Sequence, residues 1–187
     1  MWKVINMNTI ILIGYMGSGK STIGERTAKS LGMEFLDTDV LIEEQEGMTI
    51  SELFAQKGES YFRQKETETI QKLKEEAKGI VLATGGGLPM REENQKLLKK
   101  LGTVVYLKAS VDTLVERLKG DTTRPLLKEG DLRKKIETMI ENRNPIYEKV
   151  ADVVLETDNK SICEMICCLE QLWRHKDSSE FGIVKLK

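Results

Sequence analysis

Residues 14–21 of the chain, Gly-Tyr-Met-Gly-Ser-Gly-Lys-Ser, fit the pattern GxxxxGK[ST] of a phosphate-binding loop. The match is informative because the apolar run Thr9–Ile13 precedes it as a strand would, and a helical pattern follows it. Its glycines let backbone N–H groups curl around an anion, and the helix that begins near Gly19 adds the positive end of its dipole. A glycine-rich turn with a chance Lys-Ser pair is the alternative, but the flanking strand and helix favour nucleotide binding.

Two side chains of this loop are suited to phosphate chemistry. The ammonium group of Lys20 can reach the β- and γ-phosphates of a nucleotide, and the hydroxyl of Ser21 is placed to bind Mg²⁺. We therefore expect ATP or a similar nucleotide, together with Mg²⁺, at this loop.

Short apolar runs alternate with helical patterns along the chain. Most of the runs are continuously apolar, which is typical of strands buried on both faces: Thr9–Ile13, Glu34–Leu36, Ile80–Ala83, Thr103–Leu107 and Asp152–Leu155. Helices are predicted from near Gly19 to Gly32, over 112–119, and over 131–147 with an end near Pro145. This alternation predicts an α/β fold, in which a parallel sheet of about five strands binds ligands at its carboxyl ends.

The composition predicts one globular domain, residues 1–187, in the reducing cytoplasm. With 29 Lys and Arg against 30 Asp and Glu, the net charge of −1 argues against nucleic-acid binding. Short predicted helices and a balanced surface make a monomer the default. No membrane segment is expected, because the run Thr9–Ile13 is far shorter than the ~20 residues of a spanning helix. Cys163, Cys167 and Cys168 lie on a helical pattern without zinc-site spacing, which favours core packing.

Two carboxylates, Asp37 and Asp39, follow the second predicted strand. Two residues apart on an extended segment, they would face the same way. One could then support hydrated Mg²⁺ while the other orients an acceptor hydroxyl or takes its proton. The alternative is that one of them simply caps the helix that includes Val40. After a phosphate-binding loop, the pair together favours chemistry.

Arg63 and a run of three glycines predict a pocket for a second substrate. Arg63 follows Phe62, with Glu66 one helical turn further on, and is suited to grip a carboxylate with two nitrogens. The alternative for Arg63 is a surface ion pair worth roughly 0.2–0.5 kcal/mol. The glycines Gly85-Gly86-Gly87 would let a ligand approach the backbone, or would form a flexible turn that ends at Pro89.

Two further arginines lie near helix ends. Arg124 belongs to the irregular segment Gly120–Leu127, which could close over the phosphates and bring a cation to the transferring group. From position alone, a surface loop with a chance arginine is slightly favoured there. Arg143 could equally be a solvated cation at a helix end.

The sequence lacks two motifs that mark other classes of nucleotide-binding protein. The segment Asn159-Lys160-Ser161-Ile162 lacks the Asp of a guanine-reading Asn-Lys-x-Asp. The strand Ile80–Ala83 runs into glycines rather than the metal-binding carboxylate of a motor-type ATPase. These deviations favour a small-molecule kinase.

Together the blocks resemble the shikimate kinase family, whose members phosphorylate the 3-hydroxyl of shikimate on the way to chorismate and the aromatic amino acids. The matching blocks occur in the family's order within residues 9–160: Gly14–Gly24, Asp37-Thr38-Asp39, Phe62-Arg63-x-x-Glu66, Gly85-Gly86-Gly87, Arg124-Pro125-Leu126-Leu127 and Arg143-Asn144-Pro145-x-Tyr147. The resemblance implies a three-layer P-loop kinase fold with a substrate-binding segment at about 38–66 and a lid at about 120–131. The first six residues and the tail, about 175–187, have no counterpart in the family.

The resemblance also implies a role for each matched residue. The ATP contacts would be Gly17, Ser18, Gly19, Lys20, Ser21, Thr22, Arg117 on the adenine, Arg124 in the lid, and Lys160. Shikimate would be bound by Asp39, Arg63, Gly86 and Arg143, and Mg²⁺ by Ser21 directly and Asp37 through water. The catalytic groups would be Lys20, Asp39 and Arg124, with Asp39 either removing the hydroxyl proton or only orienting the hydroxyl.

Three other functions fit parts of the pattern. A gluconate-type sugar-acid kinase also combines a phosphate-binding loop with arginines, and a nucleoside monophosphate kinase would need more arginines in its lid. A nucleotide-binding regulatory module without catalysis is the third. The presence of Lys20, Ser21, Asp39 and Arg124 together argues against that module.

Overall fold

Five parallel strands form the sheet of this computed structural model, which describes residues 9–76, 79–119 and 131–174. They are β1 (Ile10–Ile13), β2 (Glu34–Asp37), β3 (Ile80–Ala83), β4 (Thr103–Lys108) and β5 (Val153–Glu156), in the order β2-β3-β1-β4-β5. Strand β1 is central, and its Ile11 lies opposite Leu82 of β3 and Val104 of β4. All five predicted strands are confirmed, each to within one residue at either end.

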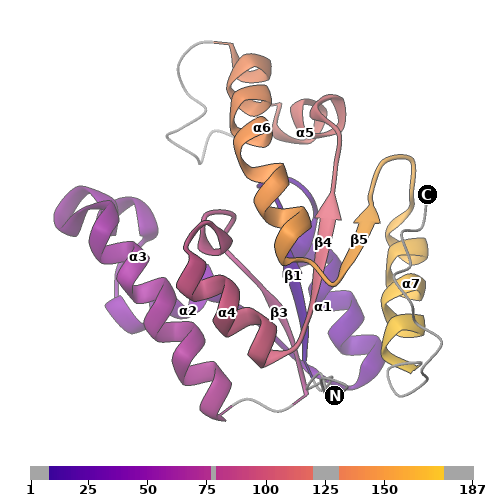
Figure 1. Cartoon of the computed structure of the whole chain (residues 1–187), viewed down its shortest axis with the longest axis horizontal. Helices are drawn as coiled ribbons and strands as arrows, with labels where there is room; N and C mark the ends of the chain where they lie inside the picture. The colour runs from indigo at the N-terminus through magenta and orange to yellow at the C-terminus, as the bar shows by residue number, and fades with distance from the viewer. Residues whose placement is uncertain (1–8, 77–78, 120–130, 175–187) are drawn as a thin grey trace.

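Helices connect the parallel strands and cover both faces of the sheet (Figure 1). They are α1 (Lys20–Leu31), α2 (Thr38–Glu46), α3 (Ile50–Glu76), α4 (Glu92–Leu101), α5 (Val111–Leu118), α6 (Leu132–Val150) and α7 (Ile162–Arg174), with a short 3₁₀ turn, η1 (Leu88–Met90). Within α3, Gly58 leaves the helical conformation at φ 81° and ψ 168°, so two helical segments meet at a kink there.

Alternate residues of β1 face opposite helical layers. Ile11 and Ile13 pack with buried residues of α3, α4 and α6, whereas Ile10 and Leu12 pack with buried residues of α1 and α7. Because side chains of a strand point alternately to its two faces, one continuously apolar strand supplies both cores. The predicted α/β fold with three layers is confirmed.

Two helix ends illustrate what the local sequence does and does not decide. Helix α1 ends at Gly32, as predicted, with a left-handed φ of 65° that glycine adopts without strain. The prediction that the later helix ends near Pro145 is wrong, because α6 continues to Val150. Proline removes one backbone hydrogen bond from a helix, and here the burial of Tyr147 and Val150 holds the final turn against the sheet.

The cysteines of α7 correct another expectation. Cys163 and Cys167 are exposed, and Cys168 is only partly buried, so core packing is wrong for the first two. The buried face of α7 carries Met165 and Leu169 instead. None of the helices in the described part of the chain is long and apolar enough to span a membrane.

Substituting Ile11→Ala tests whether β1 is the centre of the core. Ile11 is fully buried, so the substitution removes apolar contacts and leaves a cavity, and we expect the free energy of unfolding to fall by about 2–5 kcal/mol. Urea denaturation measures this difference, with the exposed Val40→Ala as a control expected to change stability by less than about 0.5 kcal/mol. A loss as small as the control's would contradict the central placement of β1.

Candidate active site

A cavity of about 1000 Å³ lies at the carboxyl ends of the strands, where the α/β pattern places a ligand. Its walls come from the segments that follow β1, β2, β3 and β5, with α5 contributing from one side. The predicted site residues that line it are Gly17, Gly19, Lys20, Ser21, Thr22, Asp37, Asp39, Gly86, Arg117 and Lys160. The structure thus brings most of the predicted site together.

The loop between β1 and α1 has the geometry of a phosphate cradle. Gly17 and Gly19 have φ angles of 79° and 94°, which residues with a side chain rarely adopt. The ammonium group of Lys20 donates to the carbonyl oxygens of Gly14 at 3.0 Å and Tyr15 at 2.9 Å, so it lies across the loop. Helix α1 begins at Lys20, which puts its N-terminus beside the cavity.

Ser18 and Arg124 stand apart from the other predicted nucleotide contacts. The side chain of Ser18 is fully buried, its backbone N–H donates to the Tyr15 carbonyl at 3.2 Å, and it is not among the residues that line the cavity. Ser18 therefore shapes the loop from within. Arg124 and the lid at about 120–131, except for residue 131, lie outside the described residues.

The junction of β2 and α2 positions the two aspartates. Asp37 Oδ1 accepts the backbone N–H of Asp39 at 3.0 Å and so caps α2, while its Oδ2 accepts the Ser21 hydroxyl at 2.9 Å. The capping and the metal-site readings of Asp37 are therefore compatible. The prediction that both aspartates share an extended segment is wrong, because Asp39 lies in the first turn of α2. Both still face the same cavity, since the chain turns between them.

The oxygen atoms of Ser21 and Asp37 suit a Mg²⁺ ion. Mg²⁺ prefers oxygen ligands and usually keeps several waters, so it is held by one or two protein groups plus substrate phosphates. A hydroxyl and a carboxylate in contact beside the phosphate loop provide such a pair. The described residues contain no cluster of three or more His, Cys, Asp or Glu side chains that would form a complete protein cage.

The outer two glycines of the Gly-Gly-Gly turn make room for charged side chains. A Cβ at Gly85 would lie 2.5 Å from Asp39 Oδ1 and 3.2 Å from Glu66 Oε1. A Cβ at Gly87 would collide with the guanidinium of Arg63. The turn therefore needs glycines because the acidic and basic groups of the site pack directly onto its backbone.

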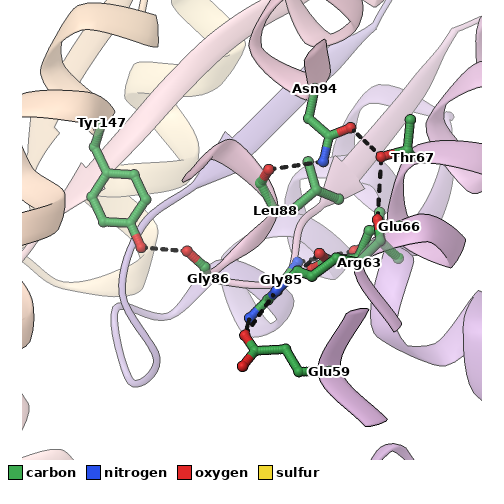
Figure 2. Close-up of polar contacts among 10 residues, drawn as sticks. Glu59, Arg63, Glu66, Thr67, Gly85, Gly86, Leu88, Asn94 and Tyr147 are labelled. Carbon is green, nitrogen blue, oxygen red and sulfur yellow. Dashed lines mark hydrogen bonds and ion pairs between the residues drawn. The ribbon is translucent and has the colours of Figure 1, made fainter. Parts of the chain in front are cut away.

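Hydrogen bonds from neighbouring helices hold the turn. The N–H of Gly85 donates to the buried hydroxyl of Thr38 at 2.9 Å, and the Asn94 amide donates to the Leu88 carbonyl at 3.0 Å. Figure 2 shows Asn94 meeting the turn from α4, with Thr67 of α3 donating to the same side chain. These hydrogen bonds tie the two ends of the turn to α2 and α4.

Arg63 lies between two glutamates of its own helix (Figure 2). Its Nη2 is 3.0 Å from Glu59 Oε1 and its Nη1 is 2.8 Å from Glu66 Oε2. Glu66 is fully buried, so the surface-pair reading of Arg63 is wrong for this contact. Arg63 does not line the cavity itself; its guanidinium lies against Gly87, next to the cavity-lining Gly86.

Burial makes Glu66 a weaker acid than an ordinary glutamate. Desolvation raises the pKa of Glu66 to about 7, although Arg63 pulls the pKa down, and the nearby charge of Asp39 pushes it further up. Within the described residues, Glu66 Oε1 has no hydrogen-bond partner. Sequence reasoning placed Glu66 beside Arg63 but assigned it no site role, because its i,i+3 spacing gives no sign of burial.

The far end of the cavity combines cations with an apolar wall. Arg117 of α5 donates to the Gly17 carbonyl at 3.2 Å, which places its guanidinium over the phosphate loop. Lys160, in the segment after β5, lines the same end together with Ile162 and Met165 of α7. Apolar side chains flanked by cations form a suitable surface for a base and its phosphates.

A phosphate loop and a hydroxyl–carboxylate pair that face one cavity at the carboxyl ends of an α/β sheet are the features of a P-loop small-molecule kinase. The model of the shikimate kinase family matches residues 16–172 of the chain. The chain belongs to the shikimate kinase family.

Individual relatives agree with that membership. A shikimate kinase of Actinobacillus pleuropneumoniae serotype 5b is 45% identical over 152 residues, covering 81% of this chain and 87% of the relative. A shikimate kinase of Legionella pneumophila strain Corby is 45% identical over 160 residues, covering 86% of this chain and 91% of the relative.

Solved structures show the same fold. The shikimate kinase of Acinetobacter baumannii in complex with shikimate superposes with a TM-score of 0.85 at 37% identity, covering 92% of this chain and 96% of that one. A deoxyadenosine kinase from M. mycoides with bound dATP reaches a TM-score of 0.60 at 17% identity, covering 89% of this chain and 99% of that one, and so shares the fold alone.

The raised pKa of Glu66 predicts a pH-dependent contribution to stability. The folded protein binds this proton more tightly than the unfolded chain, whose pKa is 4.5, so the contribution is complete below pH 4.5 and is lost as the pH rises through about 7. We expect the unfolding free energy of the wild type, minus that of Glu66→Gln, to fall by roughly 3 kcal/mol between pH 4.5 and 8.

Urea denaturation across this pH range measures the difference. Glu59→Gln is the matched control, because Glu59 contacts the same guanidinium but is exposed. Parallel pH profiles for the wild type and Glu66→Gln would show that Glu66 titrates normally.

Proposed function

We propose that this protein transfers the γ-phosphoryl group of ATP to the 3-hydroxyl of shikimate, giving shikimate 3-phosphate and ADP in the biosynthesis of chorismate and aromatic amino acids. Family membership supports a kinase that acts on shikimate. The observation that carries the proposal is one cavity lined by both Lys20 and Asp39, with Arg63 and Arg143 packed against its glycine turn.

The nucleotide would occupy the side of the cavity formed by the phosphate loop. Backbone N–H groups from Gly17 to Thr22, the start of α1 and the Lys20 ammonium would neutralise the phosphates. Arg117 and Lys160 would contact the adenosine end, since both line the cavity beyond the loop. Arg124 is proposed as a further cation that reaches the transferring group from the lid.

Mg²⁺ would be held by the Ser21 hydroxyl directly and by Asp37 through water, and when bound it would neutralise charge on the phosphates. The contact between Ser21 and Asp37 supports this assignment. Phosphoryl transfer needs little covalent help from the protein, so positioning and charge neutralisation supply most of the rate.

Shikimate would occupy the side formed by α2 and the glycine turn. Arg63 and Arg143 would bind its carboxylate, because a guanidinium carries five N–H donors and pairs with carboxylates through two nitrogens. The Gly86 backbone would contact the ring substituents. Asp39 would accept the hydrogen bond of the reacting hydroxyl and either orient it or take its proton.

The remaining proposals concern the molecule as a whole. We infer a single catalytic domain that acts as a monomer in the cytoplasm and binds neither nucleic acid nor membranes. The near-zero net charge supports this inference.

Offering several acceptors in parallel tests the proposed function. ADP release from Mg-ATP is measured with shikimate, gluconate, AMP and CMP at equal concentration, and we expect release with shikimate alone. Release with gluconate or a nucleotide would keep the phosphate loop but overturn the acceptor pocket. ATP binding without turnover of any acceptor would favour a regulatory module.

Substituting Asp39→Asn tests the role assigned to this carboxylate. The change keeps the size of the side chain but removes its charge and basicity, so we expect kcat to fall by a factor of about 10²–10⁴. ATP affinity, measured by isothermal titration calorimetry, should stay unchanged, because the phosphate loop contacts the nucleotide independently. Unchanged turnover would remove Asp39 from the mechanism.

A further inference from the structure

Tyr147 contacts the glycine turn from the opposite side to Arg63. It is fully buried in α6, and its hydroxyl donates to the Gly86 carbonyl at 2.6 Å (Figure 2). Gly86 is the central glycine of the turn and lines the cavity. A phenol from a helix distant in sequence therefore fixes the one peptide that is expected to meet the acceptor.

The same phenol also meets Arg143, one helical turn earlier in α6. The charge of the Arg143 guanidinium lowers the pKa of the Tyr147 phenol, so the two groups interact electrostatically. A Cβ at Gly86 would lie 3.5 Å from Arg143 Nη1 and 3.6 Å from the Tyr147 hydroxyl, so all three groups converge on one point. A neutral phenol can donate one hydrogen bond and accept others at the same time, so Tyr147 can serve both neighbours.

The protonation state of Tyr147 suits this double role. Burial raises the pKa of Tyr147 to about 12 even though the charge of Arg143 lowers it, so the hydroxyl keeps its proton at neutral pH. Arg143 is held on its other side by Tyr15 of the phosphate loop, whose ring centroid lies 5.8 Å from the guanidinium carbon. Arg143 thus lies between two tyrosines, one from the nucleotide loop and one from its own helix.

We propose that Tyr147 is a positioning residue for the acceptor. The single hydroxyl of Tyr147 fixes the Gly86 peptide and the Arg143 guanidinium relative to each other. This inference rests on the proposed function, in which both groups bind shikimate. Tyr147 itself does not line the cavity and touches no reacting atom. Its effect is exerted through the two groups that it fixes.

The chain provides a matched control in Tyr106. Its ring centroid lies 5.0 Å from that of Tyr147 in the same core cluster, and its hydroxyl donates to the Asn144 side chain at 2.6 Å. Replacing either tyrosine by phenylalanine removes one hydroxyl and one short hydrogen bond from the same region. A purely structural role would make the two variants alike.

The experiment compares Tyr147→Phe with Tyr106→Phe. For Tyr147→Phe we expect KM for shikimate to rise about tenfold or more, because the Gly86 carbonyl and Arg143 lose their shared partner, while KM for ATP changes less than about twofold. For Tyr106→Phe both KM values should stay within about twofold of the wild type. Thermal unfolding confirms that both variants are folded at the assay temperature.

A double-mutant cycle shows which group Tyr147 acts through. In an Arg143→Ala background, Tyr147→Phe should raise KM for shikimate by a clearly smaller factor than in the wild type, because only the Gly86 contact remains to be lost. Equal effects of the two tyrosine substitutions, a rise in KM for ATP as large as that for shikimate, or full additivity with Arg143→Ala would each overturn the proposal.

The same measurements separate this proposal from the proposed function. A wild-type protein that does not phosphorylate shikimate would overturn the function and the positioning role with it. An active wild type with an unaffected Tyr147→Phe variant would overturn only the positioning role. If Tyr147→Phe does not fold, shikimate binding is measured with the folded variants Arg143→Ala and Gly86→Ala instead. If both variants still bind shikimate as the wild type does, the proposal is overturned.

Discussion

The parallel pairing of β1 with both β3 and β4 is the constraint on which the rest of the structure depends. It places the carboxyl ends of β1 and β3 side by side, and the backbone N–H of Thr84 bonds to the Leu12 carbonyl at 3.1 Å. The phosphate loop and the glycine turn therefore start from adjacent strand ends. At their closest, a Cβ on Gly86 would lie 3.4 Å from the Gly14 carbonyl. The two loops are thus fixed by one set of sheet hydrogen bonds.

The burial of charged groups around the glycine turn opposes folding, because these groups lose their hydration. A buried ion pair such as Arg63 and Glu66 is weak evidence for stability, because desolvation opposes the attraction between the charges. Desolvation is the largest influence on the pKa of Glu66 and raises it. A chain selected only for stability would place apolar side chains at this point. The pair holds the Arg63 guanidinium against Gly87, beside the cavity-lining Gly86.

The sequence predicted those parts of the site that depend on local chemistry. The phosphate loop, the five strands and the carboxyl-end location of the cavity follow from glycine geometry and hydrophobic runs. The continuation of α6 past Pro145, the helical position of Asp39 and the exposure of Cys163 could not be predicted, because tertiary packing decides them. The role inferred for Tyr147 likewise needs a contact 61 residues away in sequence.

The three glycines show both what the local sequence can predict and what only tertiary packing decides. The outer two lack a side chain where another group must lie, with carboxylates at Gly85 and Arg63 at Gly87, while Arg143 and Tyr147 lie at ordinary contact distance from the Cβ position of Gly86. The sequence alone reveals that backbone must approach something closely, and only the fold reveals what. Because the contacting groups come from α2, α3 and α6, a displacement of any of these helices would move the turn's neighbours by the same amount. The surroundings of the glycine turn therefore depend on the packing of several helices and not on the loop alone.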